Sequence, residues 1–122
     1  MIDNTTADES AISVMQYLHN ASIKISISPL GVATINAIVG GYQGITSTID
    51  VSVYLQKYVD GGWQNMPGAN WSETFRYLHG CFAVAHQVTS GHLYRGYAII
   101  NAHCGDLCEA QSFVSNVQFY WR

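Results

Sequence analysis

Charged side chains are scarce in this chain. Its 122 residues include 5 Lys and Arg, 8 Asp and Glu and 5 His, so only 11% are charged and the net charge is -3 at pH 7. Disordered tails, coiled coils and helical bundles laced with salt bridges carry far more charge, and these classes are excluded. A negative chain also lacks the basic field that holds phosphates, so we expect neither nucleic acid nor an anionic membrane as a partner.

Long apolar runs are missing as well. No stretch approaches the roughly 18 apolar residues of a membrane span, so we expect no transmembrane segment. No basic segment followed by an apolar run marks a signal peptide. Residues 1–20 begin polar and acidic, and the part from Ile12 to Leu18 fits either a helical turn or an edge strand. We expect residues 1–20 to form a loosely ordered segment or an edge strand, and residues 21–122 to form one domain.

The chain does contain turn residues at the spacing that is typical of an all-β domain. Two Pro and 11 Gly separate short runs rich in Ile, Val and Tyr. In the first run Ile23, Ile25 and Ile27 alternate with polar residues, which is typical of a half-buried strand. Strands are expected near 21–28, 32–39, 45–58, 63–66, 71–78, 81–88, 92–103 and 108–121, and Pro67-Gly68 is expected to end the short fourth one. Such spacing predicts a two-layer antiparallel Ig-like β-sandwich of about seven strands, with a small barrel as the alternative.

Several motifs follow one another in a distinctive order. They are Ile-x-Ile-x-Ile at 23–27, the strand at 33–40, Val53-Tyr54-Leu55-Gln56-Lys57 with Gly62-Trp63, Ser90-Gly91 with Tyr94-Arg95, and Cys108-Glu109. Over residues 21–118 this order resembles small secreted β-sandwich proteins of Gram-positive bacteria, a domain family of unknown function. The resemblance implies an all-β fold and a secreted or cell-surface location, with the signal peptide removed. It implies no reaction, ligand or site residue.

The cysteines are an odd set of three. Cys104 and Cys108 flank a three-residue loop, so a hairpin there brings their side chains across from each other, and we expect a disulfide between them. A pair of reduced thiols in a reducing compartment is the alternative. Cys81 is then expected to be a small buried hydrophobe, although a bond from Cys81 to either other cysteine stays open.

Residues with metal-binding or catalytic chemistry do not form a recognisable pattern. The zinc-ligand types occur at spacings that do not suit zinc: His79, Cys81, His103, Cys104 and Cys108. Asp106 and Glu109 supply too few oxygens for calcium. The chain has no G-x-S-x-G elbow, P-loop or Cys-His frame. We therefore expect no metal, no cofactor and no catalytic residue.

The most informative constellation is aromatic. In a sandwich of this order the strands at 45–58 and 92–103 are neighbours, with Tyr94 facing the core or capping a corner of the backbone. Their outward positions then share one face and form the expected binding set: Tyr54, Tyr58, Arg95, Tyr97, Asn101 and His103. Tyr and Arg are the side chains that anchor interfaces. Cross-strand pairs that merely stabilise a solvated sheet are the alternative interpretation.

These observations predict a secreted, non-enzymatic binding or surface-interaction module. Its partner would be a protein or a carbohydrate at a cell surface, bound through the tyrosine-rich face. The alternatives are a small secreted effector or hydrolase-like enzyme, and a self-associating structural protein that forms a homodimer. A deep polar pocket would favour the enzyme, whereas a flat tyrosine-rich patch would favour binding.

Overall fold

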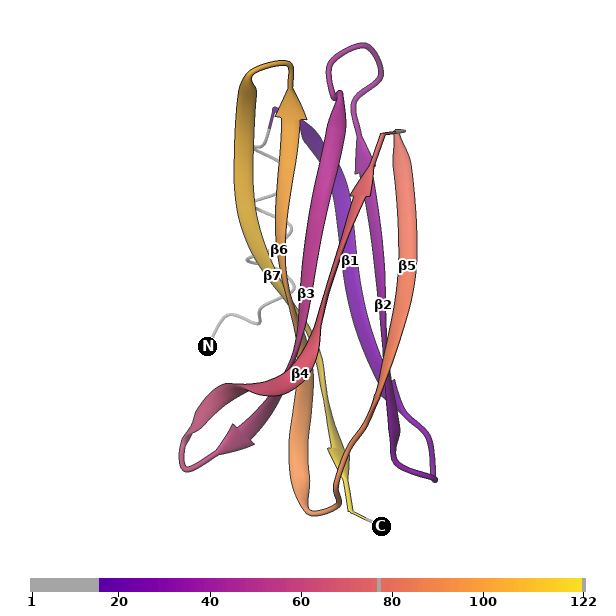
Figure 1. The fold of residues 1–122 in the computed structure, drawn as a ribbon, viewed down its shortest axis with the longest axis vertical. Helices are drawn as coiled ribbons and strands as arrows, with labels where there is room; N and C mark the ends of the chain where they lie inside the picture. The colour runs from indigo at the N-terminus through magenta and orange to yellow at the C-terminus, as the bar shows by residue number, and fades with distance from the viewer. Residues whose placement is uncertain (1–15, 77, 122) are drawn as a thin grey trace.

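Two antiparallel sheets make up the structure, a computed structural model that describes residues 16–76 and 78–121. The strands are β1 (Leu18–Ile27), β2 (Val32–Gly41), β3 (Thr48–Val59), β4 (Gly62–Phe75), β5 (His79–Gln87), β6 (His92–Cys104) and β7 (Leu107–Tyr120). One sheet has the order β1-β2-β5 and the other β4-β3-β6-β7 (Figure 1). The expected Ig-like β-sandwich of about seven strands is confirmed. Within the described residues, no helix is long and apolar enough to cross a membrane.

The core lies between the sheets, where alternate side chains of each strand meet. On β3 the inward residues are at most 1% exposed: Ile49, Val51, Val53 and Leu55. They face a matching layer from the other sheet that includes Ile25 and Ile35. Burying one such side chain contributes roughly 1.5–3 kcal/mol, so the period-two pattern of the sequence supplies the main driving force for this fold.

The N-terminal boundary and the fourth strand differ from the expected ones. β1 begins at Leu18, three residues before the predicted domain start, while residues 1–15 lie outside the described part of the chain. β4 does not end at Pro67 but continues to Phe75. Because β4 is an edge strand, the missing N–H of proline can face solvent without breaking the ladder. The residues around Pro67 form a bulge, since the pairing steps from Gln56 with Asn65 to Tyr54 with Asn70.

Among the described residues, Tyr94 is the most deeply buried aromatic side chain, with 0% exposure. Its hydroxyl donates a hydrogen bond to the Thr89 carbonyl at 2.7 Å and accepts one from the Thr89 N–H at 3.1 Å. These bonds satisfy the phenol inside the core and hold the chain where it passes from β5 to β6. Both expectations for Tyr94, an inward ring and a corner cap, are therefore met by one residue.

The two sheets touch along both open sides of the sandwich. On the side of β4 and β5, the Phe75 ring lies over Gly80, where a Cβ atom would come within 2.2 Å of the ring. On the side of β1 and β7, the Glu109 carboxylate accepts hydrogen bonds of 2.7–2.9 Å from the N–H groups of Gln16 and Tyr17. The first contact requires a residue without a side chain at position 80. The second requires the carboxylate of Glu109.

Candidate functional site

The six predicted binding residues all lie on the outer face of the four-stranded sheet. β3 and β6 are neighbours, as expected, and their register sets Tyr54 opposite Tyr97 and Thr48 opposite His103. The inward positions of both strands fill the core, so the outward positions are left for this face. The structure divides the six residues into a central tyrosine pair and one cluster at each end.

The centre of the face is the pair Tyr54 and Tyr97. Their ring centroids are 6.2 Å apart, and the ring planes are tilted by 47°. Both side chains are half-buried, so each ring keeps part of its surface in solvent. A cross-strand aromatic pair of this kind stabilises the sheet and also presents contact area whose position is already fixed.

One end of the face is built around Arg95, and we name Gln56, Tyr58, Trp63, Asn65 and Arg95 the Arg95 cluster. The Arg95 Nε atom donates to the Gln56 Oε1 atom at 2.8 Å, and the Gln56 Nε2 atom donates to the Asn65 Oδ1 atom at 2.9 Å. The guanidinium carbon lies 4.4 Å from the centroid of the Trp63 ring, and Tyr58 meets the same ring edge-on at 5.2 Å. Every member is therefore oriented by another member.

Partial burial also changes the chemistry of Arg95. Burial lowers the pKa of its guanidinium below the ordinary value, and the negative charge that Tyr97 can carry acts in the opposite direction. An arginine stays protonated at physiological pH despite such a shift. Arg95 therefore presents a positive charge that is stacked, hydrogen-bonded and held in one place.

The other end of the face is an acid-imidazole pair. The His103 Nε2 atom lies 2.8 Å from the Asp50 Oδ2 atom, and the Thr74 hydroxyl donates to the Asp50 Oδ1 atom at 2.7 Å. The hydrogen bond from Thr74 contributes most to a lowered pKa of Asp50, burial opposes it, and His103 lowers the pKa further. Asn101 lies opposite Asp50 in the register. His103 is thus occupied by Asp50 and does not join the tyrosines.

Sequence reasoning missed three members of the Arg95 cluster. They are Gln56, Trp63 and Asn65, none of which belongs to the expected binding set. A signal for Trp63 was present, because the Asp60-Gly61 turn pairs Tyr58 directly with Trp63 and so puts both on one face. The sequence gives no such signal for Gln56. It lies at an outward position, and its low exposed fraction of 9% follows from the contact with Arg95, which only the structure shows.

Exposed apolar side chains border this end of the face on β7. Val117 lies opposite Arg95 and Phe119 opposite Leu93, and their exposed fractions are 47% and 52%. These residues alternate with the inward-facing Tyr120 and carry the face across to the edge of the sheet. Together with the Arg95 cluster they form a largely apolar surface around one charge.

The expected disulfide between Cys104 and Cys108 is not formed, and all three cysteines are free thiols. The turn is one residue tighter than expected, so Cys104 pairs with Leu107 and Cys108 pairs with His103. Because successive residues of a strand point to opposite faces, the two thiols lie on opposite sides of the sheet. The expectation for Cys81 is also wrong, since its side chain is exposed on the outer face of β5.

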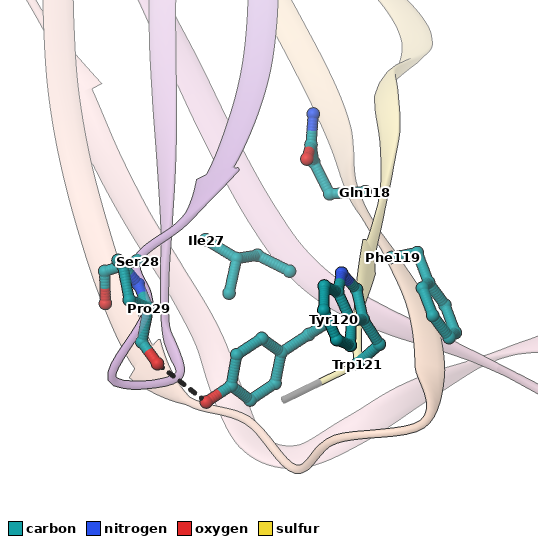
Figure 2. Close-up of a pocket in the computed structure, with 7 residues that line it drawn as sticks. All are labelled: Ile27, Ser28, Pro29, Gln118, Phe119, Tyr120 and Trp121. Carbon is teal, nitrogen blue, oxygen red and sulfur yellow. Dashed lines mark hydrogen bonds between the residues drawn. The ribbon is translucent and has the colours of Figure 1, made fainter.

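A small hollow lies at the end of the sandwich, beside the β1–β2 turn. It has a volume of about 200 Å³ and is lined by residues of the β1–β2 turn and the end of β7: Ile27, Ser28, Pro29, Gln118, Phe119, Tyr120 and Trp121. Figure 2 shows the Tyr120 ring reaching toward the turn, where its hydroxyl donates to the Pro29 carbonyl at 3.1 Å, while Phe119 points to the other side of β7.

The lining of this hollow does not suit catalysis. It includes no carboxylate, imidazole or thiol, and its volume is below the roughly 300–1,000 Å³ of small-molecule sites. Among residues 16–76 and 78–121, no group of three or more His, Cys, Asp or Glu side chains is placed to hold a metal ion. The candidate functional site is the face of the four-stranded sheet, because the tyrosine pair and the Arg95 cluster are gathered there.

Comparisons with known proteins give distant structural similarity. No protein-family model matches the chain, and no curated protein matches it. Among solved structures, the solution structure of CsgH from R. palustris has 11% identity and a TM-score of 0.43, over 77% of this chain and 89% of that one. The CARDB domain of a Pyrococcus furiosus protein, crystallised with metal ions, has 13% identity and a TM-score of 0.47, over 89% of this chain and 99% of that one.

Proposed function

We propose that this chain is a non-enzymatic binding module that recognises a protein partner through the outer face of the four-stranded sheet. The observation that supports this most directly is the Arg95 cluster beside the Tyr54–Tyr97 pair. Aromatic and arginine side chains dominate the energy of protein interfaces. Here they are gathered on one face of the sheet and bordered by exposed apolar residues of β7.

Preorganisation is the physical basis of the proposal. Ordering one flexible side chain at an interface costs about 0.5–1.5 kcal/mol, and that cost is reduced when the free protein already holds the side chain in place. Arg95 is held by Gln56 and by the Trp63 ring, and Gln56 is held in turn by Asn65. A partner would therefore meet a surface that needs little rearrangement.

The same geometry favours a protein over a carbohydrate. A sugar stacks on the open face of an indole ring, whereas the guanidinium of Arg95 lies over the Trp63 ring at 4.4 Å and Tyr58 packs against it edge-on. The charge of Arg95 and the neighbouring apolar side chains instead suit a carboxylate flanked by apolar residues on a partner protein. Such an epitope is the chemistry that we expect the face to recognise.

Location at the cell surface is a separate part of the proposal. It is supported by the sequence resemblance to secreted proteins and no longer by a disulfide, because Cys104 and Cys108 are free. Fractionation of cells that express the gene, followed by detection of the protein with an antibody, tests this part. Recovery in the cytosol alone would remove it without affecting the binding face.

Binding is tested with a partner taken from the surface extract of the source cells. The captured protein is purified and titrated by calorimetry against the wild type and three variants. We expect Tyr97→Ser and Trp63→Ser to weaken binding at least tenfold, whereas Asn36→Ala, on the outer face of the other sheet, should change it less than twofold. Equal affinity for all four proteins would exclude this face as the binding site.

A further inference from the structure

The free edge of β5 is regular, uncharged and open. β5 pairs with β2 from His79 to Gln87 without a register shift. Its sequence, HGCFAVAHQ, contains no Lys, Arg, Asp, Glu or Pro. Among the strands that the structure describes, β5 pairs only with β2 and so lies at the margin of its sheet (Figure 1). An edge of this kind is a template on which another strand can pair.

The backbone groups at this edge can be assigned from two hydrogen bonds. The Gly41 N–H donates to the Leu78 carbonyl at 2.7 Å, and the Val88 N–H donates to the Gly31 carbonyl at 2.8 Å. In an antiparallel ladder, alternate residues direct both backbone groups to the same neighbour. Even-numbered residues of β5 therefore bond to β2, and the outward N–H and C=O groups belong to the odd-numbered ones: His79, Cys81, Ala83, Ala85 and Gln87.

The other edge strands of the described chain carry protective features that β5 lacks. On β1, both backbone groups of Ile25 are bonded to the side chain of Asn116, and Lys24 adds a charge. β4 carries Pro67 and a bulge around it. β7 carries Glu109 and an irregularity in its pairing with β6. Bulges, charges and prolines are the means by which proteins prevent edge pairing.

We propose that β5 pairs with β5 of a second copy of this chain. The two strands run antiparallel about a two-fold axis at Ala83, so that the three-stranded sheets join in the order β1-β2-β5-β5-β2-β1. In this register the outward backbone groups face one another throughout. Cys81 lies opposite Ala85 of the second copy, and His79 lies opposite Gln87 of the second copy.

The inward side chains identify a second copy as the occupant. Phe82 and Val84 pack against the core layer and the Phe75 ring lies beside Phe82, with 6.0 Å between the ring centroids, yet both side chains remain half-buried. With the axis at Ala83, Phe82 of each copy lies opposite Val84 of the other. These residues form non-hydrogen-bonded pairs, in which the opposite Cα atoms are about 4.5 Å apart and the side chains pack closely. The edge is thus complementary to itself in both its backbone and its side chains.

Sedimentation velocity over a range of protein concentrations tests the association. We expect the wild type to dimerise reversibly and Ala83→Lys to weaken the dimer at least tenfold, because two ammonium groups would meet at the axis. Ala83→Pro should weaken it similarly, since it removes an N–H that faces the edge and not β2. The control is Ser26→Lys, which adds the same charge to the same sheet on β1 and should leave the dimer unchanged.

Cross-linking tests the register in a background of Cys81→Ser, Cys104→Ser and Cys108→Ser. In that background Ala83→Cys places two thiols across the axis, where mild oxidation should link the chains. Ala85→Cys places its thiols four residues apart along the strands, about 14 Å, and should not link them. A link through residue 85 but not residue 83 would overturn the register.

Other outcomes would overturn the proposal itself. A wild type that stays monomeric at millimolar concentration would do so, as would a dimer that survives Ala83→Lys. Dissociation by Tyr97→Ser but not by Ala83→Lys would transfer the contact to the four-stranded sheet. Because the β5 edge and the tyrosine face belong to different sheets, either proposal can fail while the other stands.

Discussion

The side-chain amide of Asn116 binds both backbone groups of Ile25. Its Oδ1 atom accepts the Ile25 N–H at 3.0 Å, and its Nδ2 atom donates to the Ile25 carbonyl at 3.1 Å. Asn116 lies near the point where the pairing of β6 and β7 shifts, and Gly96 donates its N–H to the Ser115 hydroxyl there. The amide of Asn116 therefore forms the two hydrogen bonds that a neighbouring strand would form with Ile25, and it joins β7 to the edge of β1.

Replacing this amide should weaken the contact between β1 and β7, which joins the two sheets on this side. We expect Asn116→Ala to lower the free energy of unfolding by about 1–3 kcal/mol, because both backbone groups of Ile25 lose their partner. Urea denaturation measures the loss, and hydrogen exchange should show faster exchange of the Ile25 amide. Asn36→Ala, an exposed position on β2, is the control, and an equal loss in both variants would contradict the role of Asn116.

The corner bond of Tyr94 should matter more than the hydroxyl of Tyr120. Tyr94→Phe leaves the buried ring in place but removes the partner of the Thr89 N–H and C=O. We expect a loss of about 1–3 kcal/mol, whereas Tyr120→Phe, whose bond to Pro29 is exposed, should cost less than about 1 kcal/mol. Thermal or urea unfolding of the two variants gives the comparison, and the reverse order would contradict it.

Gly80 should not tolerate a methyl group. In Gly80→Ala the new Cβ would lie 2.2 Å from the Phe75 ring, which must then move away from its place over β5. Overpacking of this kind costs about 1–3 kcal/mol. Gly62→Ala is the matched control, because nothing lies within 4 Å of its Cβ position. Combining Gly80→Ala with Phe75→Leu should recover part of the loss, and no recovery would show that the ring is not the obstacle.

Asp50 should give the fold an acid-dependent contribution to its stability. Its pKa in the folded chain is lowered below 3.8, chiefly by the Thr74 hydroxyl, so the contribution is present above that pH and is lost as the pH falls through the folded pKa. Thr74→Val should raise the pKa of Asp50 toward its ordinary value, as followed by carboxyl carbon chemical shifts. Ser72→Ala, the next outward position on β4, should leave that pKa unchanged, and a shift as large as that in Thr74→Val would contradict this assignment.

Much of the architecture could be predicted because the buried residues alternate cleanly. On β3 and β6 the alternation placed the core residues and the tyrosine face correctly. The alternation did not predict the positions where the pairing of two strands shifts or a turn is shorter than expected. The bulge around Pro67 keeps β4 continuous, and a tighter turn at Gly105 puts Cys104 and Cys108 on opposite faces. A shift of one residue reverses every side chain, and no local pattern reports such a shift.

The grouping of the site residues was harder to predict than their face. Parity placed Tyr54 and Tyr97 together, but it could not show that His103 is taken by Asp50 or that Arg95 turns toward Gln56 and Trp63. These choices depend on side-chain conformations and on neighbours from β4. The hairpin turn at Asp60-Gly61 places β4 beside β3, but the bulge around Pro67 changes which residues of β4 lie opposite those of β3.

The order of the strands also determines how the chain must reach this structure. Neither β2 with β5 nor β3 with β6 is joined by a short hairpin, so two of the five strand pairings wait for segments that are distant in the chain to meet. Closing such long loops before any contact stabilises them is slow, and sandwiches of this kind fold in milliseconds to seconds. During that interval β5 is paired neither with β2 nor with β5 of a second copy. Its apolar stretch is then the segment most exposed to incorrect strand pairing.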